Sequence, residues 1–211
     1  MKDIIEHMKW RYAVKKFDSD RILSKEKIDK LKEAFNLTAT SYGLQPISLL
    51  IVKNKELQNE LMTYSYHQPQ VVQASHILVF CIKDTVDANY ISKYFEQIKK
   101  VREVSDEILE PFKNDLLDSF SKKDIEQIKK WSTNQAYLAM GNLLTVCAVE
   151  RIDSCPMEGF QPEAYDKLLN LKEEGLTSVL AMPIGYRADD DIFAGFKKVR
   201  KDMAESVIEI D

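Results

Sequence analysis

The sequence has 211 residues, with 30 Lys and Arg against 34 Asp and Glu and a formal net charge of −4. This length can form one domain with a sizeable core, and the mixing of basic with acidic residues argues against a nucleic-acid-binding protein, which gathers basic residues on one face. The charged N-terminus and the lack of a long apolar run give no sign of a signal peptide or a membrane span, so we expect a cytoplasmic protein.

The first elements expected are two helices followed by a strand. Apolar residues at helical spacing predict a helix over residues 3–10, and Ser24 is a suitable N-cap for a second helix. Pro46 ends any helix and favours an extended conformation at the residue before it. The apolar run that follows therefore predicts a strand over residues 47–52.

The middle of the chain is less informative. A helix is expected over residues 55–64, and an apolar run free of charge predicts a second buried strand over residues 77–82. Residues 87–122 are charged and amphipathic. A pair of surface helices and a lid over a site would both show this pattern.

A long apolar stretch lies at residues 136–149, where almost no charge interrupts the sequence. This pattern predicts a central helix that is buried on all sides. A polar turn containing Asn134 and Gln135 is expected before the helix, and a rigid loop containing Pro156 and Gly159 after it.

The last third of the chain predicts a short helix over residues 162–171, a strand over 177–186 and a final strand over 206–210. Strands interleaved with helices indicate one α+β domain over residues 1–211, with helices packed around a single sheet.

Several kinds of site are not indicated. The three cysteines, Cys81, Cys147 and Cys155, are odd in number, and two lie in apolar runs, as expected of buried thiols in a reducing compartment. No His and Cys residues show zinc-ligand spacing, and neither a dinucleotide-binding glycine motif nor a P-loop is present. If a nucleotide cofactor binds, charged side chains must hold its phosphate.

The central helix and the loop after it carry a recognisable spacing: Gln135, Tyr137-Leu138, Gly141-Asn142 and Pro156-Met157-Glu158-Gly159-Phe160. This spacing resembles that of the nitroreductase family, whose members are FMN-dependent NAD(P)H oxidoreductases. The resemblance implies a nitroreductase-like fold, with a central mixed or antiparallel sheet flanked by helices. It also implies an intertwined homodimer with two FMN molecules and NAD(P)H as electron donor.

Two basic pairs match the family's phosphate-binding patterns. Arg11 and Lys15, with Tyr12 and Ala13 between them, resemble the N-terminal pattern that meets the phosphate and the pyrimidine edge of the flavin. Lys198 and Arg200 match the other half of this clamp near the C-terminus. Taken alone, two basic residues close together in a chain with 30 Lys and Arg usually lie on a solvated surface. Tyr12 and Ala13 occupy positions where the family often has serine, and Ile47 replaces an aromatic residue, which leaves the substrate preference open.

Other matching residues are expected around the ring and the ribityl chain. Gln70 and His67 match polar positions near the flavin, and Gln135 matches a glutamine that binds the ribityl hydroxyls, although a structural hydrogen bond is the alternative for Gln135. The backbone of Pro156, Met157, Glu158 and Gly159 is expected along the ring. There the amide of Glu158 would donate to N5, the atom that receives hydride, although Glu158 could otherwise be a surface turn residue.

A polar turn over residues 38–43, including Thr40, Ser41 and Gly43, matches a loop that contributes to the flavin site of the other subunit. The resemblance therefore implies that the sites form across a homodimer interface. An apolar central helix agrees with this, because a partner could cover one of its sides. The predicted final strand could cross to the same partner.

The activity that this resemblance implies is ping-pong transfer of hydride from NAD(P)H to a nitroaromatic, a quinone or a similar acceptor. No side chain need act as acid or base. Three alternatives stay open: a flavin-binding or storage protein without turnover, a fold relative that fragments flavin or removes halogen, and a dimerisation module without flavin. The sequence assigns neither the physiological acceptor nor a preference for NADH or NADPH.

Overall fold

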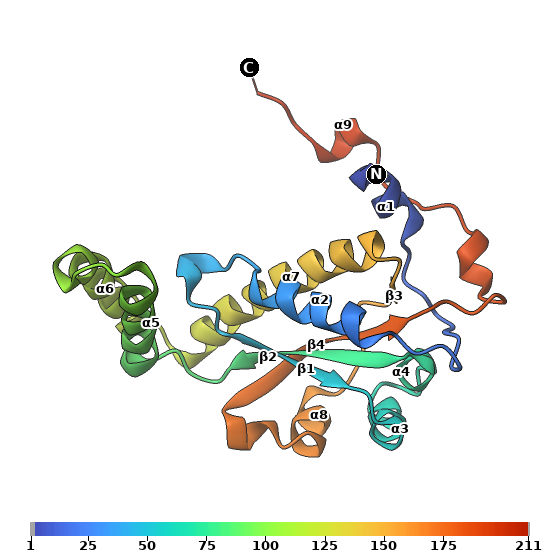
Figure 1. The fold of residues 1–211 in the computed structure, drawn as a ribbon, viewed down its shortest axis with the longest axis horizontal. Helices are drawn as coiled ribbons and strands as arrows, with labels where there is room; N and C mark the ends of the chain where they lie inside the picture. Colours follow the sequence, from blue (N-terminus) through green and yellow to red (C-terminus); the bar gives the residue numbers. More distant parts are fainter. Residues whose placement is uncertain (1–2, 211) are drawn as a thin grey trace.

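The structure is a computed structural model that describes residues 3–210 (Figure 1). Its centre is a four-stranded antiparallel sheet in the order β1-β2-β4-β3. The strands are β1 (Ile47–Val52), β2 (His76–Lys83), β3 (Asp153–Ser154) and β4 (Leu176–Gly185). The predicted α+β class is confirmed, and of the two expected sheet types the antiparallel one is found.

Helices cover both faces of the sheet. Successive side chains of β2 point to opposite faces, so alternate residues pack into two different cores. Ile77, Val79 and Cys81 pack toward α3 (Lys55–Thr63), α4 (Gln70–Gln73) and α8 (Pro162–Leu168). Leu78, Phe80 and Ile82 pack toward α2 (Lys25–Asn36) and α7 (Ile125–Val149). Figure 1 shows the resulting three layers, with α2 and α7 on one side of the sheet and α3 and α8 on the other.

The remaining helices lie at the two ends of these layers. They are α1 (Ile4–Trp10), α5 (Ala88–Arg102), α6 (Asp106–Ser121) and α9 (Met203–Ser206), with the short 3-10 helices η1 (Ser41–Gly43), η2 (Leu171–Glu174) and η3 (Ile192–Gly195). Helix α5 packs against α6 around a third apolar cluster that includes Ile91, Phe95 and Phe120. The segment at 87–122 is therefore a helical pair, and Figure 1 shows it at one end of the sheet.

Two expectations for the central helix are wrong. The helix begins at Ile125, where Asp124 and Gln127 form a reciprocal capping box, so Asn134 and Gln135 lie inside it rather than in a turn. It is also not buried on all sides in the single chain. Tyr137, Leu138 and Val149 are 45%, 55% and 43% exposed. The helix thus presents an apolar face that residues 3–210 leave uncovered.

The predicted final strand over residues 206–210 is also wrong. Ser206 ends α9, and residues 207–210 have no regular secondary structure and pair with none of the described strands. Val207, Ile208 and Ile210 are exposed. Figure 1 shows this tail leaving the body of the protein near α1. The alternation of apolar residues is real, but a strand also needs a neighbour, and none is available within residues 3–210.

Candidate functional site

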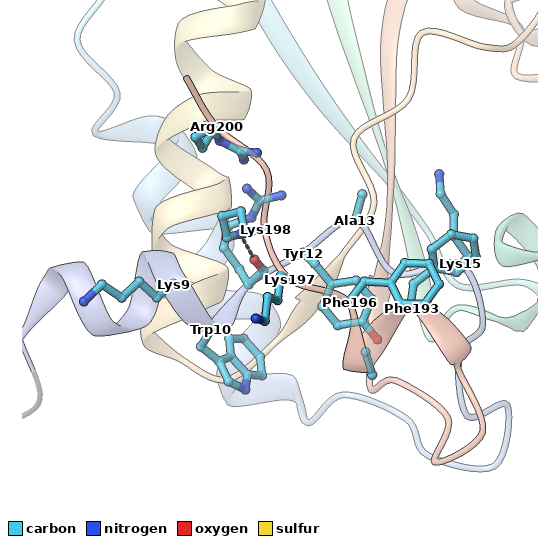
Figure 2. A pocket seen from close by; sticks show the side chains of 12 residues that line it. Lys9, Trp10, Tyr12, Ala13, Lys15, Phe193, Phe196, Lys197, Lys198 and Arg200 are labelled. Atoms are coloured by element: carbon cyan, nitrogen blue, oxygen red, sulfur yellow. Dashed lines mark hydrogen bonds between the residues drawn. The ribbon is translucent and has the colours of Figure 1, made fainter. Parts of the chain in front are cut away.

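A cavity of about 410 Å³ opens between the segment that follows α1 and the segment that follows η3. Its lining contains six of the residues expected from the sequence: Arg11, Tyr12, Ala13, Lys15, Lys198 and Arg200. Figure 2 shows the side chains of Lys198 and Arg200 in this cavity, with the rings of Phe193 and Phe196 between them and Lys15. The fold therefore brings together two segments that lie almost 190 residues apart in the chain.

Positive charge is concentrated in this cavity. Burial, together with the charge of Arg200, lowers the pKa of Arg11, and burial together with the charges of Arg11 and Arg200 lowers the pKa of Lys198. No Asp or Glu is among the lining residues described. Three cations that repel one another without a carboxylate would be stabilised by a bound anion.

Arg11 also leaves a donor unused. Its Nε is buried and has no hydrogen-bond partner within residues 3–210. Its main-chain carbonyl accepts a hydrogen bond from Nζ of Lys198, which ties the two segments together. A buried donor without an acceptor costs free energy, so this arrangement suits a ligand with several acceptor oxygens, such as a phosphate.

The loop over residues 155–159 lies next to this cavity. Val14 N donates to Ser154 O at 3.3 Å, so the N-terminal segment runs beside the start of the loop. Met157 pairs with Ala181 of β4 through two hydrogen bonds of 2.8 and 3.0 Å. The backbone N–H of Glu158 makes no hydrogen bond with any residue that the structure describes. The loop is thus fixed along the sheet while one of its donors stays available.

Two glutamine side chains, joined by a hydrogen bond, hold the other end of the loop. Gln70 is buried, and its Nε2 donates to Gln68 Oε1 at 2.9 Å. Gln68 Nε2 in turn donates to the carbonyl of Gly159 at 2.8 Å. Gln68 is a residue that the sequence reasoning missed, although it stands between two expected positions. His67 is exposed, and its side chain takes part in none of the hydrogen bonds described.

Lys15 connects the cavity with the loop through a thiol. Its Nζ lies 3.6 Å from Sγ of Cys155, which is fully buried. Burial raises the pKa of Cys155, and the nearby Lys15 opposes this shift only in part. The thiol is therefore protonated at neutral pH, and the ammonium group of Lys15 keeps hydrogen-bonding capacity for a ligand.

The other expected residues form a second group. Ser41 N donates to Gln135 Oε1 at 2.8 Å, and Gln45 N donates to Thr40 Oγ1 at 3.1 Å. Gly43 completes the turn with a φ of 73°, a conformation that glycine adopts readily. This turn contacts α7 at Gln135, in the N-terminal half of the helix, whereas the N-terminal segment reaches its C-terminal end, where His7 Nδ1 lies 3.1 Å from Ala148 O. Thr40, Ser41, Gly43 and Gln135 do not line the cationic cavity of the described chain.

A second cavity of about 420 Å³ lies between the exposed face of α7 and the loop. Tyr137, Met140, Gly141, Leu144 and Leu180 line it together with Pro156, Met157 and Glu158. The uncovered face of α7 is therefore continuous with the expected flavin loop.

None of the helices described is long and apolar enough to cross a membrane. Among residues 3–210, no group of three or more His, Cys, Asp or Glu residues is placed to hold a metal ion.

Comparison with known proteins identifies relatives along most of the chain. Residues 8–186 match the model of the nitroreductase family. A Staphylococcus epidermidis protein named "Putative NAD(P)H nitroreductase" is 33% identical over 195 residues, which cover 89% of each chain. The "Oxygen-insensitive NAD(P)H nitroreductase" of Salmonella typhimurium is 28% identical over 99% of this chain and 100% of its own.

Solved structures share the fold. A nitroreductase-like protein from Streptococcus mutans superimposes with a TM-score of 0.84 at 24% identity, over 98% of both chains. The structure of "a putative nitroreductase in complex with FMN" from Exiguobacterium sibiricum gives a TM-score of 0.83 at 18% identity, over 100% of this chain and 98% of that one. At these identities the likeness establishes the fold.

Proposed function

Because this chain belongs to the nitroreductase family, we propose that it is an FMN-dependent NAD(P)H oxidoreductase that reduces nitroaromatics, quinones or similar acceptors. Hydride transfer is the chemistry that FMN supplies when it is bound. In the proposed ping-pong sequence, NAD(P)H and the acceptor occupy the same space over the loop in turn. Residues 1–211 form a single FMN-binding domain in this proposal.

The observation that carries the proposal is the cationic cavity. Arg11, Lys198 and Arg200 meet there without a lining carboxylate, and Nε of Arg11 lacks an acceptor within the described chain. A phosphate dianion supplies the charge and the acceptor oxygens that this group needs, and guanidinium groups can bind two of those oxygens at once.

The loop provides the surface for the ring. Pro156, Met157, Glu158 and Gly159 lie beside the segment that carries Arg11 and Lys15. The available N–H of Glu158 is suited to donate to N5 of the ring. Lys15 contacts the loop at Cys155, and Gln70 is linked to it through Gln68. These residues bind and orient the cofactor. No side chain is assigned as a proton donor or acceptor.

The proposal includes a homodimer with two FMN molecules. Gln135 holds the turn that contains Thr40, Ser41 and Gly43 at the N-terminal half of α7, whereas the cationic cavity follows α1, which contacts the C-terminal end of α7. If two copies pack antiparallel through the apolar face of α7, the end of one helix meets the opposite end of its partner. Each site would then receive residues from both chains, and the exposed tail over residues 207–210 could cover the partner.

A cytoplasmic location belongs to the same proposal. Cys81, Cys147 and Cys155 are all free thiols and all buried. Free thiols are usual in proteins of reducing compartments.

The test is the visible spectrum of the purified protein before and after anaerobic addition of NADPH, and then of NADH. A flavin band that one nicotinamide bleaches, and that returns when a quinone or a nitroarene is added, is the expected result. A flavin band that neither nicotinamide bleaches would instead indicate a carrier or another flavin reaction. A colourless protein that rejects added FMN would overturn the proposal.

A further inference from the structure

One buried carboxylate joins the two segments that line the cationic cavity. Asp191 is 5% exposed and begins η3, where its Oδ1 accepts a hydrogen bond from Phe193 N at 3.1 Å. Its Oδ2 accepts from the hydroxyl of Tyr12 at 2.9 Å and from Lys15 N at 3.1 Å. Lys16 N is 3.4 Å from the same oxygen. A single side chain therefore holds residues 12–16 and the start of the segment that leads to Lys198 and Arg200.

The chemistry of these contacts keeps Asp191 ionised. Burial opposes ionisation, but the hydrogen bonds from Lys15 N, Phe193 N and the hydroxyl of Tyr12 outweigh it and lower the pKa of Asp191. Burial and the hydrogen bond to Asp191 raise the pKa of Tyr12, so its hydroxyl stays a donor. Hydrogen bonds to a charged acceptor are stronger than those between neutral groups.

Little else fixes the segment that carries the two C-terminal cations. Residues 196–202 have no regular secondary structure and are exposed. The contact from Lys198 to the carbonyl of Arg11 is one link with the N-terminal segment. The anchor at Asp191 stands at the base of this segment, before Phe193 and Phe196, whose rings pack edge to face 5.4 Å apart.

We propose that Asp191 is a positioning residue, whose carboxylate fixes the N-terminal segment against the C-terminal one so that Arg11, Lys198 and Arg200 face one phosphate group. This inference rests on the proposed function, because it takes the phosphate to be that of FMN. Asp191 itself touches no part of the cofactor in this proposal.

The direction in which the FMN affinity changes distinguishes a positioning role of Asp191 from a purely electrostatic one. Replacing Asp191 with Asn removes a negative charge close to the cationic cavity, which by Coulomb's law alone should strengthen the binding of a phosphate. Positioning predicts the opposite result. Asn offers one acceptor oxygen where Asp offers two, so in either orientation its amide nitrogen faces Phe193 N or the donors of Tyr12 and Lys15, and the link between the two segments is weakened.

The experiment compares FMN with riboflavin, which lacks the phosphate, as ligands of the flavin-free protein. Dissociation constants come from quenching of flavin fluorescence. For Asp191→Asn we expect FMN to bind roughly tenfold more weakly, the loss expected for a hydrogen bond to a charged group. Riboflavin binding should change by less than about twofold, because the cations act on the phosphate.

Two further variants make the result decisive. Tyr12→Phe removes one hydroxyl without changing charge, and should lower the FMN-to-riboflavin affinity ratio in the same direction by a smaller factor. Asp190→Asn is the matched control, because the neighbouring Asp190 is exposed and, among residues 3–210, forms an ion pair only with Lys16. Its ratio should equal that of the unmodified protein.

The inference is overturned if Asp191→Asn binds FMN more tightly, leaves both affinities unchanged, or weakens both ligands equally. Equal weakening, with a lowered melting temperature, would mean that Asp191 only stabilises the fold. If the unmodified protein binds neither flavin, the proposed function itself fails, and this inference falls with it. That outcome differs from the others because it appears before any substitution is made.

Discussion

The hydroxyl of Tyr137 donates a hydrogen bond of 2.6 Å to Oε1 of Glu158. This contact connects the exposed face of α7 with the loop that we propose to lie along the flavin ring. The hydrogen bond and the charge of Glu158 raise the pKa of Tyr137, together with a contribution from burial, so the phenol stays protonated and keeps donating.

We expect Tyr137→Phe to release FMN about threefold faster, because an exposed hydrogen bond to a carboxylate contributes little stability but here restrains the loop. The rate is measured from the recovery of flavin fluorescence after dilution. Tyr64→Phe is the control, because the structure describes no hydrogen bond of the Tyr64 hydroxyl. An unchanged release rate for Tyr137→Phe would show that the contact does not hold the loop.

The cationic cavity makes a prediction about salt. Arg200→Ala should weaken FMN binding roughly tenfold and leave riboflavin binding almost unchanged, because a guanidinium group acts on the phosphate. The dependence of the FMN dissociation constant on salt concentration should also become shallower, because one cation fewer attracts the phosphate and salt therefore has less attraction to screen. Lys201→Ala removes a neighbouring charge that does not line the cavity, and should have little effect. Equal losses for both variants would argue against a specific phosphate site.

The uncovered face of α7 predicts a dimer. Leu138 is 55% exposed on this helix, and Leu138→Glu should shift the protein toward monomer in sedimentation velocity, because a charge would be buried in an apolar interface. The same variant should lose FMN, because in the proposed dimer each site takes residues from both chains. Ile22→Glu places a charge at another exposed apolar residue and serves as control. A variant that stays dimeric, or an unmodified protein that is monomeric, would contradict the proposed interface.

His76 predicts how stability depends on pH. It is buried at the start of β2, and burial, followed by the charges of Lys53 and Lys55, lowers its pKa from 6.5 to about 4. The unfolded chain therefore binds a proton before the folded one does. The resulting contribution to the free energy of unfolding is complete above pH 6.5 and decreases as the pH falls toward 4.

Urea unfolding between pH 4.5 and 7.5 measures this decrease. His76→Gln should flatten the profile in this interval, because the titrating group is gone. His67→Gln removes an exposed histidine and should keep the slope of the unmodified protein. If both variants show the same slope, other groups cause the pH dependence.

The elements predicted most accurately from the sequence are those that depend on residues close together in the chain. The strand at Ile47–Val52 was predicted with its observed bounds, because Pro46 marks its start and an apolar run its length. The N-cap role of Ser24 was also confirmed. In α7, by contrast, the charged first turns resemble a surface segment, so only its apolar half was recognised. The two-residue strand β3 carries no pattern at all, because its pairing with β4 depends on the rest of the fold.

For the candidate site, local patterns could indicate Arg11, Lys15, Lys198 and Arg200, and the structure places all four around one cavity. Their roles toward a flavin stay predictions. No local pattern could indicate Asp191, because its partner Tyr12 lies 179 positions away. Asp191 gains these contacts only when the folded chain brings residues 12–16 beside it.

The separation of the two groups of site residues along α7 has a genetic consequence. If each site takes residues from both chains, then a protein defective in Arg200 and a protein defective in Gln135 are damaged in different halves of the same site. A mixed dimer of the two would contain one site with both defects and one site with none. Two inactive alleles expressed together would then restore part of the activity that neither has alone.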